Sequence, residues 1–504
     1  MYRNGNPYAI PSTIRDRLAE FNASIEREEE KLGLLVAQLQ DVLLRAQRQR
    51  SLNNALLSSI RRLPPEVLSE IFLHAAADQR KMDLTKPGHH YHFARVCHLW
   101  RFVALTTPAL WTDVSVKTVE TPNIHNLFAH EFPLAGEYPL RVRLEHPAWH
   151  AKLDEGRATR SWDLLLQQSH RWQTLDLALD YHVFCGMTPQ PVSCISLETL
   201  SSSLGVVDLE RLTGSSAEVP SIFSSLADAP RLRRVELITG LIPGTHSLRF
   251  PASWRLSHLV LEVKACGSLA RLLSLIRQLA PTLRTFSLDI IRAMATFLPP
   301  PLNEDVRFPK LVEFTCFRGA CFLFQHIAAP KLSSLSIGRH PVPLSSYGAA
   351  PLDSIAGRIG MCANLLELLI IDVIWPAESS LDTLRCLENL TSLDLREKKD
   401  EYVGRYINNE LFVGLTRGGV EVEGVVTGPN PACPLPRLER MRVVLYKDSE
   451  ERPGLIAALR TMALSRRNVE EDGGDPVLIP LRKFSSSRYR QGTTEKKTIL
   501  SWDD

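Results

Sequence analysis

The sequence predicts an α+β protein of several domains: a long N-terminal helix, a small all-α module, and an α/β array of repeats. Three observations lead to this prediction. Apolar residues recur every three or four positions near the N-terminus, two short amphipathic helices follow, and a spaced apolar pattern then recurs almost to the C-terminus. A chain of 504 residues is long enough to hold more than one folding unit.

The first element is a long amphipathic helix over residues 14–60, predicted by a heptad pattern. One heptad position holds Ile14, Phe21, Glu28, Leu35, Val42, Gln49 and Leu56, and the other holds Leu18, Ile25, Leu32, Leu39, Ala46, Asn53 and Ile60. The polar Glu28, Gln49 and Asn53 and the interior Gly33 weaken the pattern. Two outcomes remain open: a coiled coil, or a helix that folds back on its own chain.

Two short helices are predicted next. Pro64 and Pro65 suit the first turn of a helix, where a missing N–H costs nothing. One helical stripe then comprises Val67, Leu68, Ile71, Phe72 and Ala75. Residues 78–91 are polar, contain Pro87-Gly88 and are predicted to form a loop. A second apolar stripe, predicted to lie on one helix, comprises Phe93, Val96, Cys97, Trp100 and Val103.

The second helix should end before Pro108, because the residue before a proline avoids the α region. Two helices this short cannot bury all of these apolar side chains between themselves. We therefore expect part of their surface to face a partner. An ordinary helical hairpin buried within a larger domain is the alternative.

Residues 60–114 resemble an F-box. The resemblance rests on Leu63-Pro64, Glu66-Val67-Leu68, Ile71-Phe72, the Val96-Cys97-x-x-Trp100 spacing and Leu110-Trp111. The long 78–91 segment departs from the family by lengthening a connection, and it removes no motif position. In that family the F-box binds a Skp-type adaptor, which links it to a cullin–RING ubiquitin ligase.

The resemblance implies that adaptor docking uses residues on both helices and on the segment after them. These are Leu63, Pro64, Val67, Leu68, Ile71, Phe72, Val96, Trp100, Leu110 and Trp111. Some of them must form the core of the module itself, and the sequence does not separate the two sets.

After Val116 a pattern recurs: an apolar residue, two others, an apolar residue, one other, and an apolar residue. Copies begin at Trp172, Leu232, Leu256, Leu283, Leu311, Leu332, Leu365, Leu390 and Leu438, with a partial copy at Leu197. Proline stands two residues before the first apolar residue at Pro230, Pro281, Pro309, Pro330 and Pro436. Since proline ends a helix and cannot donate to a sheet, each unit is predicted to be helix, proline stop and short strand.

This region resembles the irregular leucine-rich repeats that follow F-boxes in many members of that family, without their regular Asn or Cys after the strand. A generic α/β domain is the alternative. Residues 397–434 are predicted to be an inserted loop or hairpin, and a helix at 452–465 with a strand at 477–481 to cap the array. The whole combination resembles the expanded F-box families of mushroom-forming fungi.

The predicted boundaries follow from these patterns. They are 1–57 for the heptad helix, 58–115 for the F-box domain, 116–160 for a connecting segment, 161–482 for the leucine-rich-repeat-like solenoid, and 483–504 for a polar, mobile tail.

Composition argues against several classes of partner. A net charge of +3 is too small to favour nucleic acid or an acidic membrane surface. We see no signal peptide and no apolar run long enough to span a membrane. The nine cysteines are scattered without a Cys-x-x-Cys pair, which fits a reducing compartment. We therefore expect an intracellular protein, in the cytoplasm, the nucleus or both.

The sequence contains no catalytic motif that we recognise, so we expect no catalytic residue, cofactor or metal. The densest group of possible zinc ligands is His89, His90 and His92 with Cys97 and His98. It lies in and beside the predicted loop, so we expect solvated histidines there.

The predicted function is that of a substrate-recognition subunit of an SCF-type ubiquitin ligase, which is not itself an enzyme. The F-box would hold the adaptor, and the strand face of the repeats would hold a target protein that the sequence does not identify. The alternatives are a binding scaffold that acts outside any ligase and an enzyme with an unrecognised site.

Overall fold

The structure is a computed structural model. It describes residues 12–82, 91–117, 124–146, 155–180, 192–205, 222–240, 249–266, 269–293, 305–338, 356–371, 377–397, 407–416, 421–422, 425–426, 434–445, 454–467, 480–489 and 496–503. The chain divides into two compact units. The first comprises residues 1–83 and 90–106, and the second comprises residues 84–89 and 107–504.

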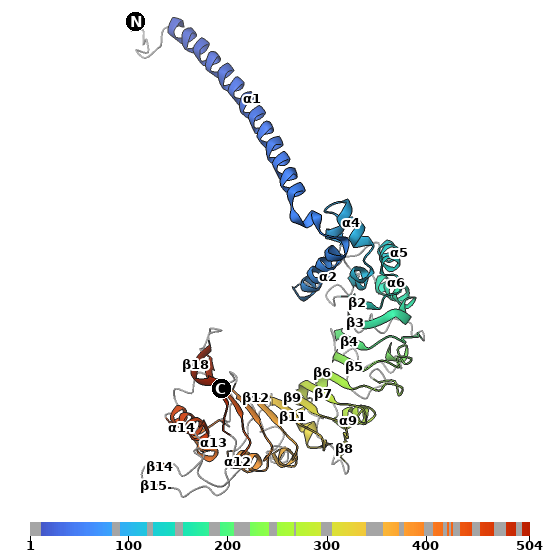
Figure 1. The fold of residues 1–504 in the computed structure, drawn as a ribbon, viewed down its shortest axis with the longest axis vertical. Coiled ribbons are helices and arrows are strands. Elements are labelled where there is room, and N and C mark those ends of the chain that lie inside the picture. The colour runs from blue at the N-terminus through green and yellow to red at the C-terminus, as the bar shows by residue number, and fades with distance from the viewer. Residues whose placement is uncertain are drawn as a thin grey trace, which may run out of the picture. The chain divides into compact units, whose positions relative to one another are not determined.

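The first unit is helical. Its elements are α1 (Ser12–Leu57), the 3-10 helix η1 (Ser59–Arg62), α2 (Pro65–Met82), α3 (Tyr91–Ala94) and α4 (His98–Leu105). The predicted long helix is confirmed, because α1 continues without a break through Gly33 (Figure 1). A Cβ at Gly33 would meet no other atom within 4 Å, so no neighbouring element requires a glycine there.

Two predictions for this unit were wrong. Helix α2 continues to Met82, so at least the first part of the predicted 78–91 loop is helical; residues 83–90 lie outside the described residues. The second stripe is not one helix. Cys97 is extended, with φ −158° and ψ 174°, and separates α3 from α4. The Arg101 side chain donates a hydrogen bond to the Ala94 carbonyl at 2.8 Å, which satisfies the exposed end of α3.

The second unit is built on one large sheet. Its strands are β1 (Asp113–Lys117), β2 (Leu140–Glu145), β3 (Trp172–Asp180), β4 (Thr199–Gly205), β5 (Arg234–Thr239), β6 (His258–Cys266), β7 (Thr285–Ala293), β9 (Glu313–Arg318), β11 (Ser334–Gly338), β12 (Glu367–Ile371), β13 (Ser392–Arg396), β16 (Arg440–Leu445), β17 (Lys483–Tyr489) and β18 (Lys496–Asp503). Each pairs with the next in this order, in parallel throughout except for the antiparallel pair of β17 and β18.

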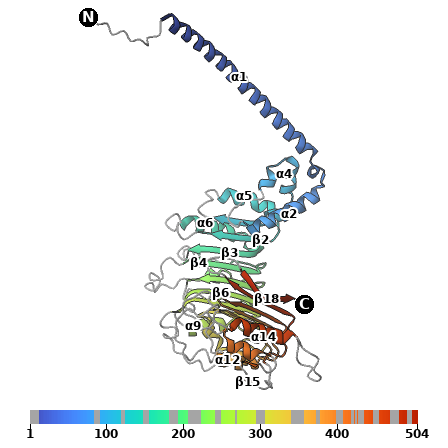
Figure 2. The ribbon, with the colours of Figure 1, turned by 90° about the vertical axis from the view of Figure 1, so that its left-hand side faces the viewer.

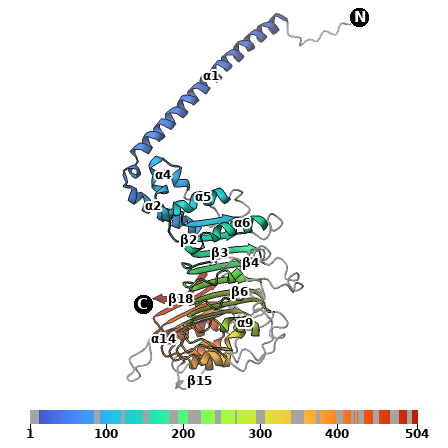
Figure 3. The same ribbon diagram turned by 90° about the vertical axis from the view of Figure 1, so that its right-hand side faces the viewer.

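Helices lie along the outer side of this curved sheet (Figures 1 and 3). They are α5 (Ile124–Ala135), α6 (Glu155–Leu166), α9 (Leu269–Arg277), α10 (Cys321–Phe324), α12 (Ala377–Arg385), α13 (Asn409–Leu415) and α14 (Leu455–Arg467), with the 3-10 turns η2 (Pro108–Trp111), η4 (Ser169–Arg171) and η5 (Ile222–Ser224). Figure 2 looks toward the inner side, where successive strands cross the view one above another.

Every complete copy of the apolar pattern forms a strand, as predicted. The second and third apolar residues of each copy are buried and align across the sheet, as Leu259 aligns with Phe286 and Leu261 with Leu288. Alternate strand residues point to opposite faces of a sheet, so this spacing buries one face and leaves the other open. The parallel sheet follows from the repetition of one unit.

The partial copy at Leu197 forms β4, although it lacks the third apolar residue of the pattern. Ser202 aligns with Leu177 on β3 and with Leu237 on β5, so a serine occupies the third apolar position. Ser202 is buried, and its hydroxyl has no hydrogen-bond partner among the residues that the structure describes. This strand therefore places a polar atom in an apolar core, which is unfavourable.

A repeated hydrogen-bond pattern holds each copy on the one before it. One carbonyl at the start of a copy accepts two consecutive N–H groups from the next, as Arg233 O accepts from Ser257 and His258. The same arrangement recurs at the carbonyls of Glu198, Ser257, Arg284, Val312, Ser333, Leu366, Thr391 and Glu439. The backbone thus repeats even where the spacing along the sequence is irregular.

The sheet extends beyond the predicted repeats at both ends. β2 lies within the segment 116–160 that was predicted only to connect, and β17 and β18 lie within the predicted tail. Both predictions were wrong. The strands were missed because neither stretch carries a complete copy of the apolar pattern. Of the strand predicted at 477–481, residues 477–479 lie outside the described residues, and Leu481 precedes β17.

The other two C-terminal predictions are confirmed in part. Helix α14 covers the predicted helix at 452–465, shifted by two to three residues, and its role as a cap stays a prediction. The predicted insertion at 397–434 contains an antiparallel hairpin of β14 (Glu421–Val422) and β15 (Val425–Val426), but also α13, a helix with buried side chains that was not predicted. A further short pair, β8 (Val306–Arg307) and β10 (Ile327–Ala328), lies outside the main sheet.

Candidate functional site

The core of the first unit forms where α2 meets α3 and α4. Phe72 is fully buried, and its ring stacks on Phe93 with centroids 4.5 Å apart. The same ring meets Trp100 at 4.9 Å and an interplanar angle of 57°. Leu68, one turn earlier on α2, is also fully buried. Phe72 and Leu68 are therefore structural residues of this unit.

A second group of apolar residues in this unit is exposed. On α2, Val67 is 43% exposed and Ile71 is 39% exposed, and their spacing of four places them on one side of the helix. Val96, in the break before α4, is 59% exposed. Pro64, which precedes α2, is also exposed. Val67 and Ile71 directly precede the core residues Leu68 and Phe72, so α2 carries both a core face and an open apolar face.

The inner face of the sheet in the second unit is mainly polar. Small hydroxyl side chains lie on β4, β7, β9 and β11, at Ser201, Ser203, Ser287, Thr315, Ser334 and Ser336, which alternate with buried strand residues. Charged residues on this face form pairs: Arg234 lies 2.5 Å from Glu236, and Arg440 reaches across β13 to Glu367 at 3.0 Å. Most of the charge on this face is thus already balanced within the chain.

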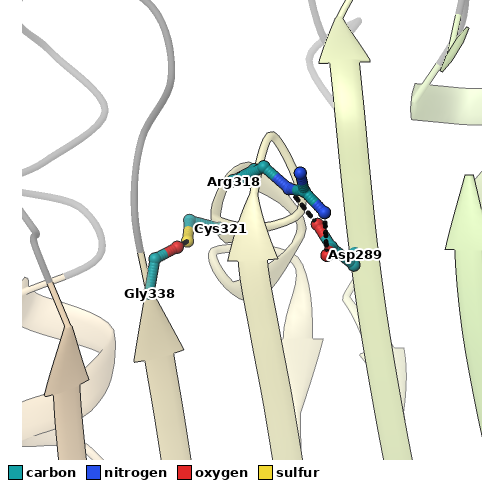
Figure 4. Close-up of polar contacts among 4 residues, drawn as sticks. All are labelled: Asp289, Arg318, Cys321 and Gly338. Atoms are coloured by element: carbon teal, nitrogen blue, oxygen red, sulfur yellow. Dashed lines mark hydrogen bonds and ion pairs between the residues drawn. The ribbon is translucent and has the colours of Figure 1, made fainter. Parts of the chain in front are cut away.

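Side-chain hydrogen bonds connect the carboxyl ends of β7, β9 and β11 (Figure 4). Arg318 has a positive φ of 55°, and its guanidinium binds both carboxylate oxygens of Asp289, with Nε 2.6 Å from Oδ1. This hydrogen-bonded pair raises the pKa of Arg318. The thiol of Cys321 donates to the Gly338 carbonyl at 3.6 Å, which ties α10 to β11.

The ring of Phe317 lies against Gly338 on the neighbouring strand. A Cβ at Gly338 would overlap Cδ1 and Cε1 of that ring. Phe317 is part-exposed, so its ring contributes apolar surface to this face, as do Ile238, Val260 and Leu369. Glycine is required at position 338 because the Phe317 ring leaves no room for a Cβ. The backbone conformation is not the reason, since φ at Gly338 lies outside the left-handed range.

Residues 60–117 match the family model of F-box-like domains. The chain carries an F-box-like domain. The matched range includes α2, α3, α4, η2 and β1. None of the curated proteins matches the chain. The F-box resemblance inferred from the motifs is confirmed over these residues.

Burial separates the ten residues predicted to dock the adaptor. Leu68, Phe72, Leu110 and Trp111 are buried, Leu63 and Trp100 are half-buried, and Pro64, Val67, Ile71 and Val96 are exposed. The buried four are structural in the chain as it stands. Adaptor docking by any of the ten remains a prediction, and the exposed four are the ones that can reach a partner without rearrangement.

The sequence reasoning missed two exposed apolar residues of the F-box-like domain. Phe102 and Leu105 on α4 are 54% and 40% exposed. The available signal was their spacing of three, which places them on one side of α4, away from the buried Val103 and Ala104. They extend the open apolar surface of this domain beyond the motif residues.

The described residues offer little for covalent or metal chemistry. Among them no three His, Cys, Asp or Glu side chains gather as metal ligands; His89 and His90 lie outside the described residues. Burial raises the pKa of the Cys194 thiol to about 12 and that of Cys362 to about 11, so both stay protonated near neutral pH. No described helix is long and apolar enough to cross a membrane.

Proposed function

We propose that this protein is a substrate-recognition subunit of an SCF-type cullin–RING ubiquitin ligase. The observation that carries the proposal is the F-box-like domain at residues 60–117, with an open apolar face beside a closed core. F-box domains typically bind Skp-type adaptors, and the adaptor connects them to the ligase. In this role the chain contributes binding and no catalytic residue.

The proposed adaptor surface is built from Pro64, Val67, Ile71 and Val96. Apolar side chains that are about half exposed gain roughly 25 cal/mol for each Å² that a partner covers. Several such residues beside one another supply an anchor of the kind found at interface centres. Phe102 and Leu105 add to the same apolar character on α4.

The proposed target site is the inner face of the large sheet. Its support is the regular, sequential parallel sheet, which is the arrangement of a leucine-rich-repeat-like solenoid. Such repeats present a broad strand face on which a partner chain can be held. Hydroxyl groups on this face offer adaptable hydrogen bonds, and the Phe317 ring with Ile238 offers apolar contacts.

The mechanism is proximity. A chain that holds the adaptor at one site and a target at another raises the effective concentration of the target lysine near the transferring enzyme. The ligation itself is carried out by other subunits. The identity of the target would be determined by the side chains of the inner face.

Co-purification of the full chain with a purified Skp-type adaptor tests the proposal. Wild type should capture the adaptor in a stable complex, and Val67→Ala/Ile71→Ala should lose most of it while remaining folded by circular dichroism. Val413→Ala on α13 is the matched control, because Val413 is 40% exposed, like Val67 at 43%. A wild-type chain that captures no adaptor contradicts the proposal.

A scaffold that acts outside a ligase is the second candidate. The specific observation in its favour is α1, a helix of 46 residues whose described side chains are all exposed. A wild-type chain that captures no adaptor but does bind a partner through α1 would favour the scaffold.

A further inference from the structure

Helix α1 exposes a continuous apolar seam. The seam comprises eight large apolar side chains at the heptad positions and beside them, each 41–61% exposed: Ile25, Leu32, Leu35, Val36, Leu39, Val42, Leu43 and Leu52. Leu34 and Leu44 are also exposed, but they lie at heptad positions away from the seam. No described side chain of α1 is buried or half-buried. An isolated helix in water is only marginally stable, and helices in proteins are held mainly by packing of their apolar face. The seam therefore needs another apolar surface to pack against.

We propose that the occupant is a second copy of this chain, paired with α1 in the antiparallel direction. The helix runs uninterrupted through its midpoint, which is inconsistent with a hairpin folded onto itself. This inference does not depend on the proposed ligase function, since it concerns only α1.

Charge along α1 selects the direction. The first half is acidic around Glu26, Glu28, Glu29 and Glu30, whereas the second half is basic around Arg45, Arg48 and Arg50. An in-register parallel pair would set Glu28 against Glu28 in the seam and Arg45 beside Arg50. Like charges at such positions are destabilising, so the parallel arrangement is disfavoured.

One antiparallel register satisfies the flanking and polar positions together. It pairs Leu39 with Val42, Leu35 with Ala46, Val36 with Leu43, Glu29 with Arg50, and Glu28 with Asn53 of the other copy. Each pairing occurs twice because the arrangement is two-fold symmetric. Glu29 and Arg50 become an ion pair at the edge of the seam, and the seam residue Glu28 gains a side-chain amide as its partner. Leu32 opposite Gln49 is the one seam mismatch in this segment.

The area is sufficient for a stable dimer. Covering the eight apolar side chains on both copies removes on the order of 1,400 Å² from water, and stable interfaces bury about 1,200–2,000 Å². Extra apolar positions beside the heptad, at Val36 and Leu43, widen the seam and match each other in the antiparallel register.

Sedimentation velocity of the full chain at several concentrations tests the proposal. Wild type should dimerise. Glu29→Lys alone and Arg50→Glu alone should each raise the dimer dissociation constant about tenfold, because each turns two attractive pairs into repulsive ones. The double variant Glu29→Lys/Arg50→Glu should restore wild-type association, since the pair is re-formed with its signs exchanged.

Glu30→Lys and Arg48→Glu are the matched controls. They make the same charge changes at heptad positions that face away from the seam, so dimerisation should stay within about twofold of wild type. A monomeric wild type would overturn the proposal. So would a double variant no better than either single variant, because residues 29 and 50 meet only in the antiparallel register. All four side chains are exposed, so the variants should keep the far-UV spectrum of wild type.

Discussion

Two adjacent residues on α2 should separate stability from binding. Phe72 is fully buried between Phe93 and Trp100, whereas Ile71 is 39% exposed. Replacing a buried phenylalanine by alanine typically costs about 3–5 kcal/mol, the loss of burial plus the cavity that remains. Replacing Ile71 by alanine removes only partly buried atoms and should cost about 1 kcal/mol.

Hydrogen exchange of the α2 and α4 amides measures both changes directly. Phe72→Ala should lower the free energy of opening by about 3 kcal/mol or more, which corresponds to roughly a hundredfold faster exchange. Ile71→Ala should change exchange by less than about tenfold and yet reduce adaptor capture. Equal effects of the two substitutions on exchange would refute the division of this helix into a core face and an open face.

Three further predictions concern the second unit. Gly338→Ala should destabilise the second unit by about 1–3 kcal/mol in denaturant unfolding, and Phe317→Ala should relieve most of that loss because the overlapping ring is gone. Ser202→Ala should raise the midpoint of thermal unfolding slightly, since it removes a buried hydroxyl that has no partner in the described part of the chain. Arg466→Met should cost about 3 kcal/mol or more, because the buried guanidinium donates to the carbonyls of residues 415, 434 and 435. For each variant, an unfolding curve identical to that of its parent protein would contradict the structural reason given.

The repeat array was the most predictable part of the fold. The apolar triplet determines which face of a strand is buried, and it did so for every complete copy. From the copy at Leu232 onward, the same pair of backbone hydrogen bonds to the preceding copy also recurs. The additional strands β2, β17 and β18 carry no complete triplet, so their inclusion depends on pairing with a neighbour already in the sheet. Pairing of that kind is a tertiary effect that local sequence does not encode.

The sequence predicted that an F-box-like domain is present, but not which of its apolar residues are buried and which are exposed. Leu68 and Val67 are equally apolar and adjacent, yet one is buried and the other is 43% exposed. The stripe of the second helix also failed at Val96, because Cys97 is extended and Arg101 satisfies the end of α3. Core and surface residues alternate within one motif, so only the packing of the helices assigns them.

The most direct test of the proposed function is a hydrogen-exchange footprint of a purified Skp-type adaptor on the full chain. Protection is expected at the amides of Val67 and Ile71 and around Val96, with little change on the strands of the inner face. No protection at saturating adaptor, or protection confined to those strands, would contradict the proposal that the open face of the F-box-like domain docks the adaptor.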